Sequence, residues 1–150
     1  MKRALLSSAL ACGLVAALSG HAAAKDAYLT KPPANFKKVS TLVKLPDFLP
    51  GLGTLYVDPK TLPVGPFLGY DKKGALVNVT YMVPLKQLEA RKGWDNLGNA
   101  VAGAKVDHTD ISYNPGHPGV EEPHYHFINW LIPHSEEAAR VGGGGEHSGH

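Results

Sequence analysis

Residues 75–83 read Ala-Leu-Val-Asn-Val-Thr-Tyr-Met-Val and carry the clearest strand signal in the chain. β-branched and aromatic side chains dominate this stretch, and such residues pack well on a pleated surface. The turn-forming sequence Asp71-Lys-Lys-Gly74 comes just before it, and Pro66–Tyr70, before that turn, has the pattern of a shorter strand. The pattern therefore predicts two strands joined by a turn.

Other segments carry weaker strand and helix signals. Short apolar and aromatic runs bounded by Gly or Pro predict further strands, and apolar residues three apart after Pro84 predict a short helix that Gly93 ends. These elements predict an α+β fold, mainly antiparallel β as a small sandwich or a barrel-like sheet, with one or two short helices. The further strands are Thr54–Val57, Val106–Tyr113 and His124–Ile132, and the helices are Leu85–Lys92 and Glu136–Val141, the second capped by Ser135.

The chain divides into four regions. Residues 1–24 match a secretory signal, with Lys2 and Arg3 before an apolar stretch and the small residues Ala22–Ala24 at a cleavage site. Residues 25–50 are rich in proline and are predicted to be an extended lead-in with one strand. Residues 51–141 are predicted to form a single mainly-β domain, and residues 142–150 a flexible tail rich in Gly and His.

The signal sets expectations about location and stability. We expect the mature chain to begin at Lys25 and to reside in the periplasm or outside the cell. A lipoprotein signal would instead be cut before Cys12, but Ala9 stands where such signals usually have Leu. A mature chain without Cys12 has no cysteine, so it contains neither a disulfide nor a thiolate metal site. Its stability then comes from a packed core or from assembly as a homo-oligomer.

Charge and motifs exclude several function classes. The chain has 15 Lys and Arg against 13 Asp and Glu, and cleavage removes Lys2 and Arg3, which leaves 13 of each sign. A neutral mature chain argues against nucleic acid or anionic lipid as a partner, and no apolar run after the signal is long enough to span a bilayer. Nucleophile motifs, phosphate-binding loops and dinucleotide fingerprints are missing from the sequence. The sequence therefore favours a binding role over an enzyme without settling the question.

The histidines are concentrated at the C-terminal end of the chain. Of the eight, only His21 lies in the signal, and the other seven all lie at or after His108. Neutral imidazole is the commonest protein ligand for transition metals, so this clustering predicts binding of a divalent ion such as Zn, Cu, Ni or Fe. The remaining histidines are His117, His124, His126, His134, His147 and His150.

His124 and His126 form the core of the predicted site. Residues two apart in a strand point to the same face, with Cα atoms about 6 to 7 Å apart, so both rings can reach one ion. The third ligand is left open between His117 on the intervening loop and His108 or Asp110 on the preceding strand, because the sequence does not fix the register of the two strands.

Metal-free interpretations remain for each of these residues. A pair of histidines two apart also occurs on solvated strand faces, and His117, between Gly116 and Pro118, is equally typical of a turn residue whose ring bonds nearby backbone. His134, at the start of the last predicted helix, is expected to be structural or exposed. His147 and His150 follow four glycines, and a mobile tail lacks the fixed surroundings of a tuned metal site.

The histidine segment resembles a family of secreted bacterial domains of unknown function. The family signature has an aromatic residue, Asn-Pro and Gly-His, then a loop with Pro and Gly, then Pro-His and further histidine or acid before Phe. The matching residues here are Tyr113–His117, Pro118–Val120 and Pro123–Phe127, and the likeness covers most of Gly51–Trp130. The family spacing places an acid and then another histidine where this chain has His126 and Ile128, so its site differs from the family pattern. The resemblance implies a secreted, largely β domain and supplies no activity.

A weaker resemblance is to the cupin barrel, in which a glycine precedes a pair of histidines two apart. Gly119 followed by His124 and His126 fits in part, but the glutamate expected after the pair is missing, with Trp130 and Leu131 in that region. A cupin-like small metalloenzyme is therefore the alternative to a metal-binding domain, and a closed barrel around the histidines would distinguish it. The other alternative, a metal-free structural or interaction domain, would have its imidazoles pointing apart.

Overall fold

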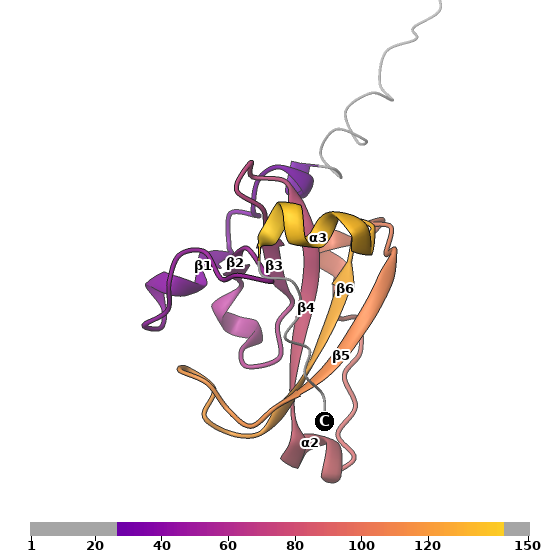
Figure 1. The fold of residues 1–150 in the computed structure, drawn as a ribbon. Coiled ribbons are helices and arrows are strands. Elements are labelled where there is room, and N and C mark those ends of the chain that lie inside the picture. Colours follow the sequence, from indigo (N-terminus) through magenta and orange to yellow (C-terminus); the bar gives the residue numbers. More distant parts are fainter. Residues whose placement is uncertain (1–26, 143–150) are drawn as a thin grey trace, which may run out of the picture.

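The computed structural model describes residues 27–142, so the predicted signal, Cys12 and most of the predicted tail lie outside the described residues. The described chain forms one six-stranded antiparallel sheet in the order β1-β2-β3-β4-β6-β5 (Figure 1). The prediction of a mainly antiparallel α+β fold is confirmed. The strands are β1 (Lys37–Lys38), β2 (Thr54–Val57), β3 (Phe67–Tyr70), β4 (Leu76–Pro84), β5 (His108–Asn114) and β6 (His124–Trp130).

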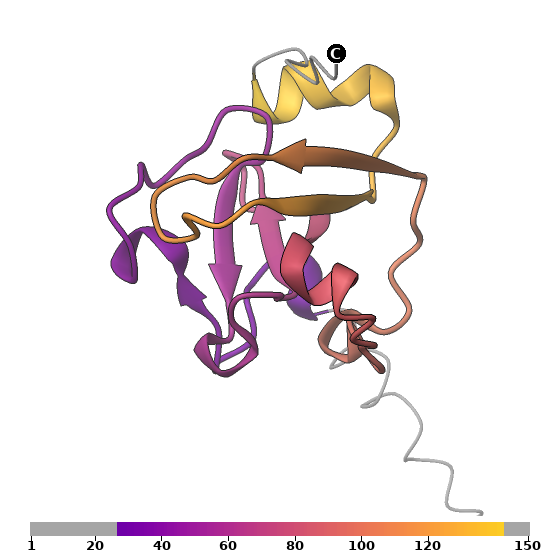
Figure 2. The ribbon, with the colours of Figure 1, turned by 90° about the horizontal axis from the view of Figure 1, so that it is seen from below.

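The sheet is open, because β1 and β5 are edge strands that do not pair with one another. It twists strongly between these edges, so that β5 and β6 run across the direction of β2 and β3 (Figure 2). The closed barrel that would favour a cupin is therefore not formed by the described residues.

The predicted strand at residues 75–83 is the central strand β4. It pairs with β3 on one side and with β6 on the other, and eight of its nine residues are buried. Both faces of β4 are covered, which explains why its sequence is a nearly continuous apolar run without strict alternation. The predicted turn before it is formed as well, because the Asp71 carboxylate accepts hydrogen bonds from the backbone N–H groups of Lys73 and Ala75, both at 2.9 Å.

Three apolar clusters cover the two faces of the sheet, two of them on one face and one on the other. Residues opposite one another in antiparallel strands share a face, so the face with His124 and His126 also carries Ile128 and Trp130 of β6. On this face Ile128 and Trp130 pack with Val141, while Val57, Phe67 and Met82 form a cluster nearer the histidines. The third cluster, on the other face, contains Tyr28, Phe36, Leu68, Tyr70, Leu76, Val79 and Val101.

The segment predicted as an extended lead-in contributes to the sheet and to the core. Its strand is the two-residue β1, which pairs with β2, and it also contains the short 3-10 helices η1 (Ala27–Leu29) and η2 (Val39–Thr41). The Tyr70 hydroxyl, buried under this segment, donates a hydrogen bond of 2.6 Å to the Tyr28 carbonyl. Burial raises the pKa of Tyr70 above its ordinary value. Residues 27–50 are therefore part of the packed fold.

Both predicted helices are present, with different boundaries. Helix α2 spans only Leu85–Glu89, and Pro84 immediately precedes its first turn. The connection from α2 to β5 contains the short 3-10 helix η4 (Asn99–Val101). None of the helices within residues 27–142 has the length and apolar character needed to cross a membrane.

Helix α3 spans His134–Val141 and lies across the end of the sheet where β6 stops (Figure 1). The prediction that Ser135 caps it is wrong. The helix starts directly after Pro133, whose fixed φ of −60° suits a helix start, and Ser135 lies inside the first turn. Arg140 fixes its other end, with Nε and Nη2 donating to the Asp71 carboxylate at 2.9 and 2.7 Å.

Candidate metal centre

The strand β6 places His124 and His126 on one face of the sheet, as their spacing predicts. His124 lies opposite Pro84 of β4 and Asn114 of β5, and His126 lies opposite Met82 and Ser112. His124 is fully buried, whereas His126 is half-buried. The pair therefore sits at the end of the sheet where the β5–β6 connection leaves and returns.

The connection between β5 and β6 folds back over this face. His117 and Val120 exchange backbone hydrogen bonds of 2.9 Å, which closes a tight turn. Gly116 makes the return with a φ of +134°, and a Cβ at this position would lie 2.6 Å from the Glu121 carbonyl oxygen, so only glycine fits. Val120 packs on the apolar cluster that contains Met82. This contact fixes the loop that carries His117.

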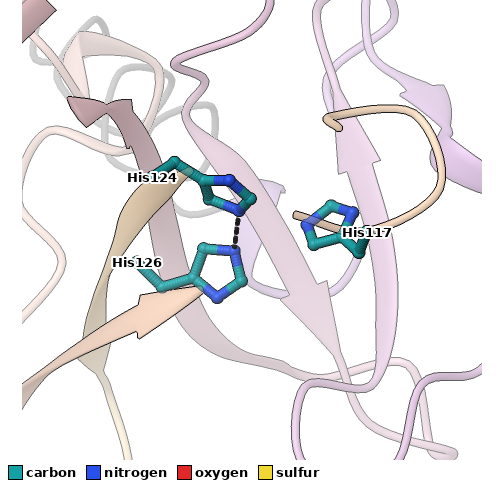
Figure 3. Close-up of side chains that lie close together, drawn as sticks. All are labelled: His117, His124 and His126. Carbon is teal, nitrogen blue, oxygen red and sulfur yellow. Dashed lines mark hydrogen bonds between the residues drawn. The ribbon is translucent and has the colours of Figure 1, made fainter. Parts of the chain in front are cut away.

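The three imidazoles meet in one place (Figure 3). Nε2 of His124 lies 2.9 Å from Nε2 of His126. The ring centroid of His117 lies 4.9 Å from that of His124 and 5.6 Å from that of His126. One nitrogen from each ring can be chosen so that all three lie within 4.8 Å of one another. The metal-free alternative in which the imidazoles point apart does not describe this arrangement.

Backbone carbonyls hold the other nitrogens of two rings. Nδ1 of His124 lies 2.7 Å from the Glu122 carbonyl oxygen, and Nδ1 of His117 lies 3.1 Å from the Pro118 carbonyl oxygen. A carbonyl only accepts, so each Nδ1 carries the proton and each Nε2 keeps its lone pair, an assignment made from the hydrogen-bond network. This is the tautomer that metal-ligating histidines commonly adopt. His117 thus bonds nearby backbone, as its turn interpretation expects, and also joins the cluster.

The spacing of the three nitrogens suits one small ion after modest side-chain rotation. Imidazole nitrogens bind Zn²⁺ at about 2.0 to 2.1 Å, which puts ligand atoms of a tetrahedral site roughly 3.4 Å apart. The Nε2 atoms of His124 and His126 lie closer together than this, at 2.9 Å. The most distant pair of nitrogens in the group lies farther apart, at up to 4.8 Å. Three neutral imidazoles of this kind are able to hold a transition metal ion.

His108 and Asp110 do not share this space, contrary to expectation. The antiparallel register places His108 opposite Trp130 and Asp110 opposite Ile128. His108 is therefore six residues along the strand from the level of His124, or about 20 Å. The sequence could not exclude their participation because it does not fix the register. Asp110 accepts a hydrogen bond of 2.8 Å from the Trp130 indole.

His108 instead lies beside helix α3, next to His134 and Glu137. Burial disfavours the charged form of His108, but neighbouring carboxylates, Asp107 foremost, outweigh burial and raise its pKa above the ordinary value. The His134 side chain is 85% exposed, as expected for a histidine at a helix start. Glu137 is not among the ligands predicted from the sequence, although residues three apart on a helix, such as His134 and Glu137, share a face.

The chain was compared with protein families, with curated proteins and with solved structures. A scan against protein-family models found no match, and a search of curated proteins also found none. Among solved structures, the chain is similar to the crystal structure of hypothetical protein TTHB210 from Thermus thermophilus, at 47% sequence identity and a TM-score of 0.60. The match covers 66% of this chain and 94% of that chain. That protein is described only as hypothetical, so it supplies no activity. The identity and coverage show that the chain belongs to the same protein family as TTHB210.

Proposed function

We propose that this protein is an exported metal-binding protein that holds one divalent transition metal ion between His117, His124 and His126. The observation that carries the proposal is the convergence of three imidazole nitrogens to within 4.8 Å. The exported location rests on the signal expected over residues 1–24. The proposal assigns no catalytic step to the site.

The surroundings of His124 support a site prepared for an ion. The ring is fully buried, and its Nδ1 is fixed by the Glu122 carbonyl, so its orientation is set before an ion arrives. Hydrogen bonds of this kind orient the imidazole of a metal ligand. Because His126 and His117 lie on a strand and on a closed turn, all three ligands are held by the fold.

The ligand set indicates the class of ion. Imidazole nitrogens suit Zn, Cu, Ni and Fe, whereas Ca²⁺ and Mg²⁺ prefer oxygen ligands. Three protein ligands leave a coordination position for water or another small ligand, as in zinc sites with three histidines. His117 and His126 are only partly buried, so this position is reachable from solvent.

Equilibrium binding of Zn²⁺ tests the proposal. The exported protein should be purified without a polyhistidine tag, with His147→Gln and His150→Gln to remove the tail histidines. We expect His126→Gln to weaken binding at this site by at least about tenfold, since it removes one of three ligands. Tyr125→Phe is the matched control, because Tyr125 is the adjacent residue of β6 and faces the other side of the sheet.

Two results distinguish a metal site from a structural pair. Loss of one bound equivalent in His126→Gln but not in Tyr125→Phe supports the proposal. Equal zinc binding by the parent protein and by His126→Gln contradicts it. The hydrogen bond between His124 and His126 is then a purely structural contact.

A further inference from the structure

A second group of metal-ligating side chains lies at the opposite end of the β5–β6 hairpin. It consists of His108 at the start of β5 and His134 and Glu137 in the first turn of α3. One ligand atom from each residue lies within 4.8 Å of the other two. The register that pairs His108 with Trp130, and Asn114 with His124, separates this group from the first cluster by most of the length of the hairpin.

The ring of His108 is oriented by two contacts. It stacks on the buried Trp130, with ring centroids 6.2 Å apart and an interplanar angle of 19°. Its Nδ1 lies 2.9 Å from a carboxylate oxygen of Asp107. This carboxylate holds the proton on Nδ1, so that Nε2 is the nitrogen that would bind an ion, as in the carboxylate–histidine–metal arrangements of many metal sites.

Nε2 of His108 is buried and makes no hydrogen bond within residues 27–142. Oε1 of Glu137 lies only 2.9 Å from this Nε2. The oxygen lies too far from the direction in which an Nε2–H bond would point for the contact to count as a hydrogen bond. In a neutral ring the Nε2 lone pair would face this carboxylate at unfavourably short range, and a cation bound between the two atoms would remove that repulsion. This close approach of a buried ring nitrogen and a carboxylate oxygen, beside the His134 ring, is the observation that points to a ligand.

Helix α3 supplies the other two groups. The His134 ring meets the His108 ring edge-on with centroids 5.8 Å apart, and its Nδ1 lies 2.8 Å from Oε1 of Glu137. The Glu137 side chain is only 14% exposed. The helix itself is fixed by the Asp71–Arg140 ion pair and by the buried Val141, so these ligands have a defined position relative to β5.

We infer that His108, His134 and Glu137 form a second binding site for a divalent transition metal ion, with two histidines and one carboxylate as ligands. Such a set occupies one side of an ion and leaves other positions open, as in non-haem iron sites and in zinc sites with two histidines and a glutamate. The exposed His134 makes this site accessible from solvent, in contrast to the buried His124 of the first cluster.

The inference is independent of the proposed function, and counting bound ions tests it. The probe is Zn²⁺, and the exported protein carries His147→Gln and His150→Gln as above. We expect this parent protein to bind two equivalents, and His134→Gln to bind one. Because His134 is exposed, its replacement should leave the thermal unfolding of the metal-free protein unchanged, which separates loss of a ligand from loss of the fold.

A second variant acts without removing a ligand. Asp107→Asn keeps the side-chain shape but weakens the orientation of His108, so we expect a loss of about 10- to 100-fold in affinity at this site. His126→Gln should leave that affinity unchanged.

The outcomes separate the two sites. Loss of one equivalent in His134→Gln supports the second site, even if His126→Gln changes nothing and the first proposal fails. A parent protein and a His134→Gln variant with the same number of bound ions and the same affinities overturn the second site.

Discussion

The Nε2 atoms of His124 and His126 lie 2.9 Å apart on one face of β6. One ring must donate and the other accept, and the bond from Nδ1 of His124 to the Glu122 carbonyl makes His124 the acceptor. The lone pair that accepts this hydrogen bond is the one that would bind an ion. The same contact thus satisfies a buried ring in the metal-free protein and prepares a ligand.

Removal of the His124 ring should destabilise the metal-free protein. His124→Ala leaves a cavity at a fully buried position and removes the partner of the Glu122 carbonyl, so we expect a loss of about 2 to 4 kcal/mol in the free energy of unfolding. Urea unfolding in the presence of a chelator measures it. His117→Ala, on the partly exposed loop, should cost less than about 1 kcal/mol. Equal effects of the two changes would mean that His124 is not the structural centre of the cluster.

Zinc should stabilise the fold through the first cluster. An ion that binds only the native state adds roughly 2.7 kcal/mol to the free energy of unfolding when its free concentration is a hundred times the dissociation constant. The measurement is urea unfolding with and without Zn²⁺ in the His134→Gln background, which removes the second group. If zinc stabilises the His126→Gln variant as much as the parent, the ion that stabilises the fold binds elsewhere in the chain.

The ion pair between Asp71 and Arg140 should make stability depend on pH. Burial opposes ionisation of Asp71, but the N–H of Ala75, the Arg140 guanidinium and the N–H of Lys73 outweigh it, and the pKa of Asp71 lies below its ordinary value of 3.8. The carboxylate therefore binds protons less readily in the folded chain than in the unfolded chain. Ionised Asp71 contributes its full stabilisation at pH values above its pKa in the unfolded chain. This stabilisation is lost as the pH falls through its lower pKa in the folded chain.

Asp71→Asn tests this dependence. We expect a loss of about 1.5 to 3 kcal/mol at pH 7, since charged hydrogen bonds are removed, and a smaller loss at pH 3. Urea unfolding at both pH values measures the difference between parent and variant. The same loss at both pH values would show that the charge of Asp71 does not contribute.

Gly69 is predicted to tolerate no side chain. A Cβ at this position would collide with the amide of the buried Asn78 and would lie 2.5 Å from the Leu52 carbonyl oxygen, to which Asn78 donates a hydrogen bond. We expect Gly69→Ala to cost about 1 to 3 kcal/mol of unfolding free energy. Gly93→Ala is the matched control, because a Cβ there meets no atom within 4 Å, and it should be nearly neutral. Thermal unfolding of the two variants compares them, and similar midpoints would contradict the packing described for β3 and β4.

The sequence predicted the parts of the fold that depend on local pattern. The strand at residues 75–83, the turn at Asp71–Gly74 and the shared face of His124 and His126 follow from residue type and alternation. The place of His117 depends on the turn that Gly116 permits and on the packing of Val120, neither of which alternation specifies.

Long-range packing explains what the sequence did not predict. The approach of His108 to Glu137 depends on the register of β5 against β6 and on how α3 docks, which the ion pair of Asp71 and Arg140 helps to fix. Residues 69 positions apart in the chain form that ion pair, and no local pattern signals it. Ser135 does not cap α3, because the helix begins directly after Pro133 and already contains Ser135.

The most direct test of the central claim is anomalous diffraction at the zinc edge from crystals of the His134→Gln variant grown with Zn²⁺. The account predicts one strong peak about 2.0 to 2.1 Å from an imidazole nitrogen of each of His117, His124 and His126. The contrary result is no peak at this position, with Nε2 of His124 still bonded to Nε2 of His126.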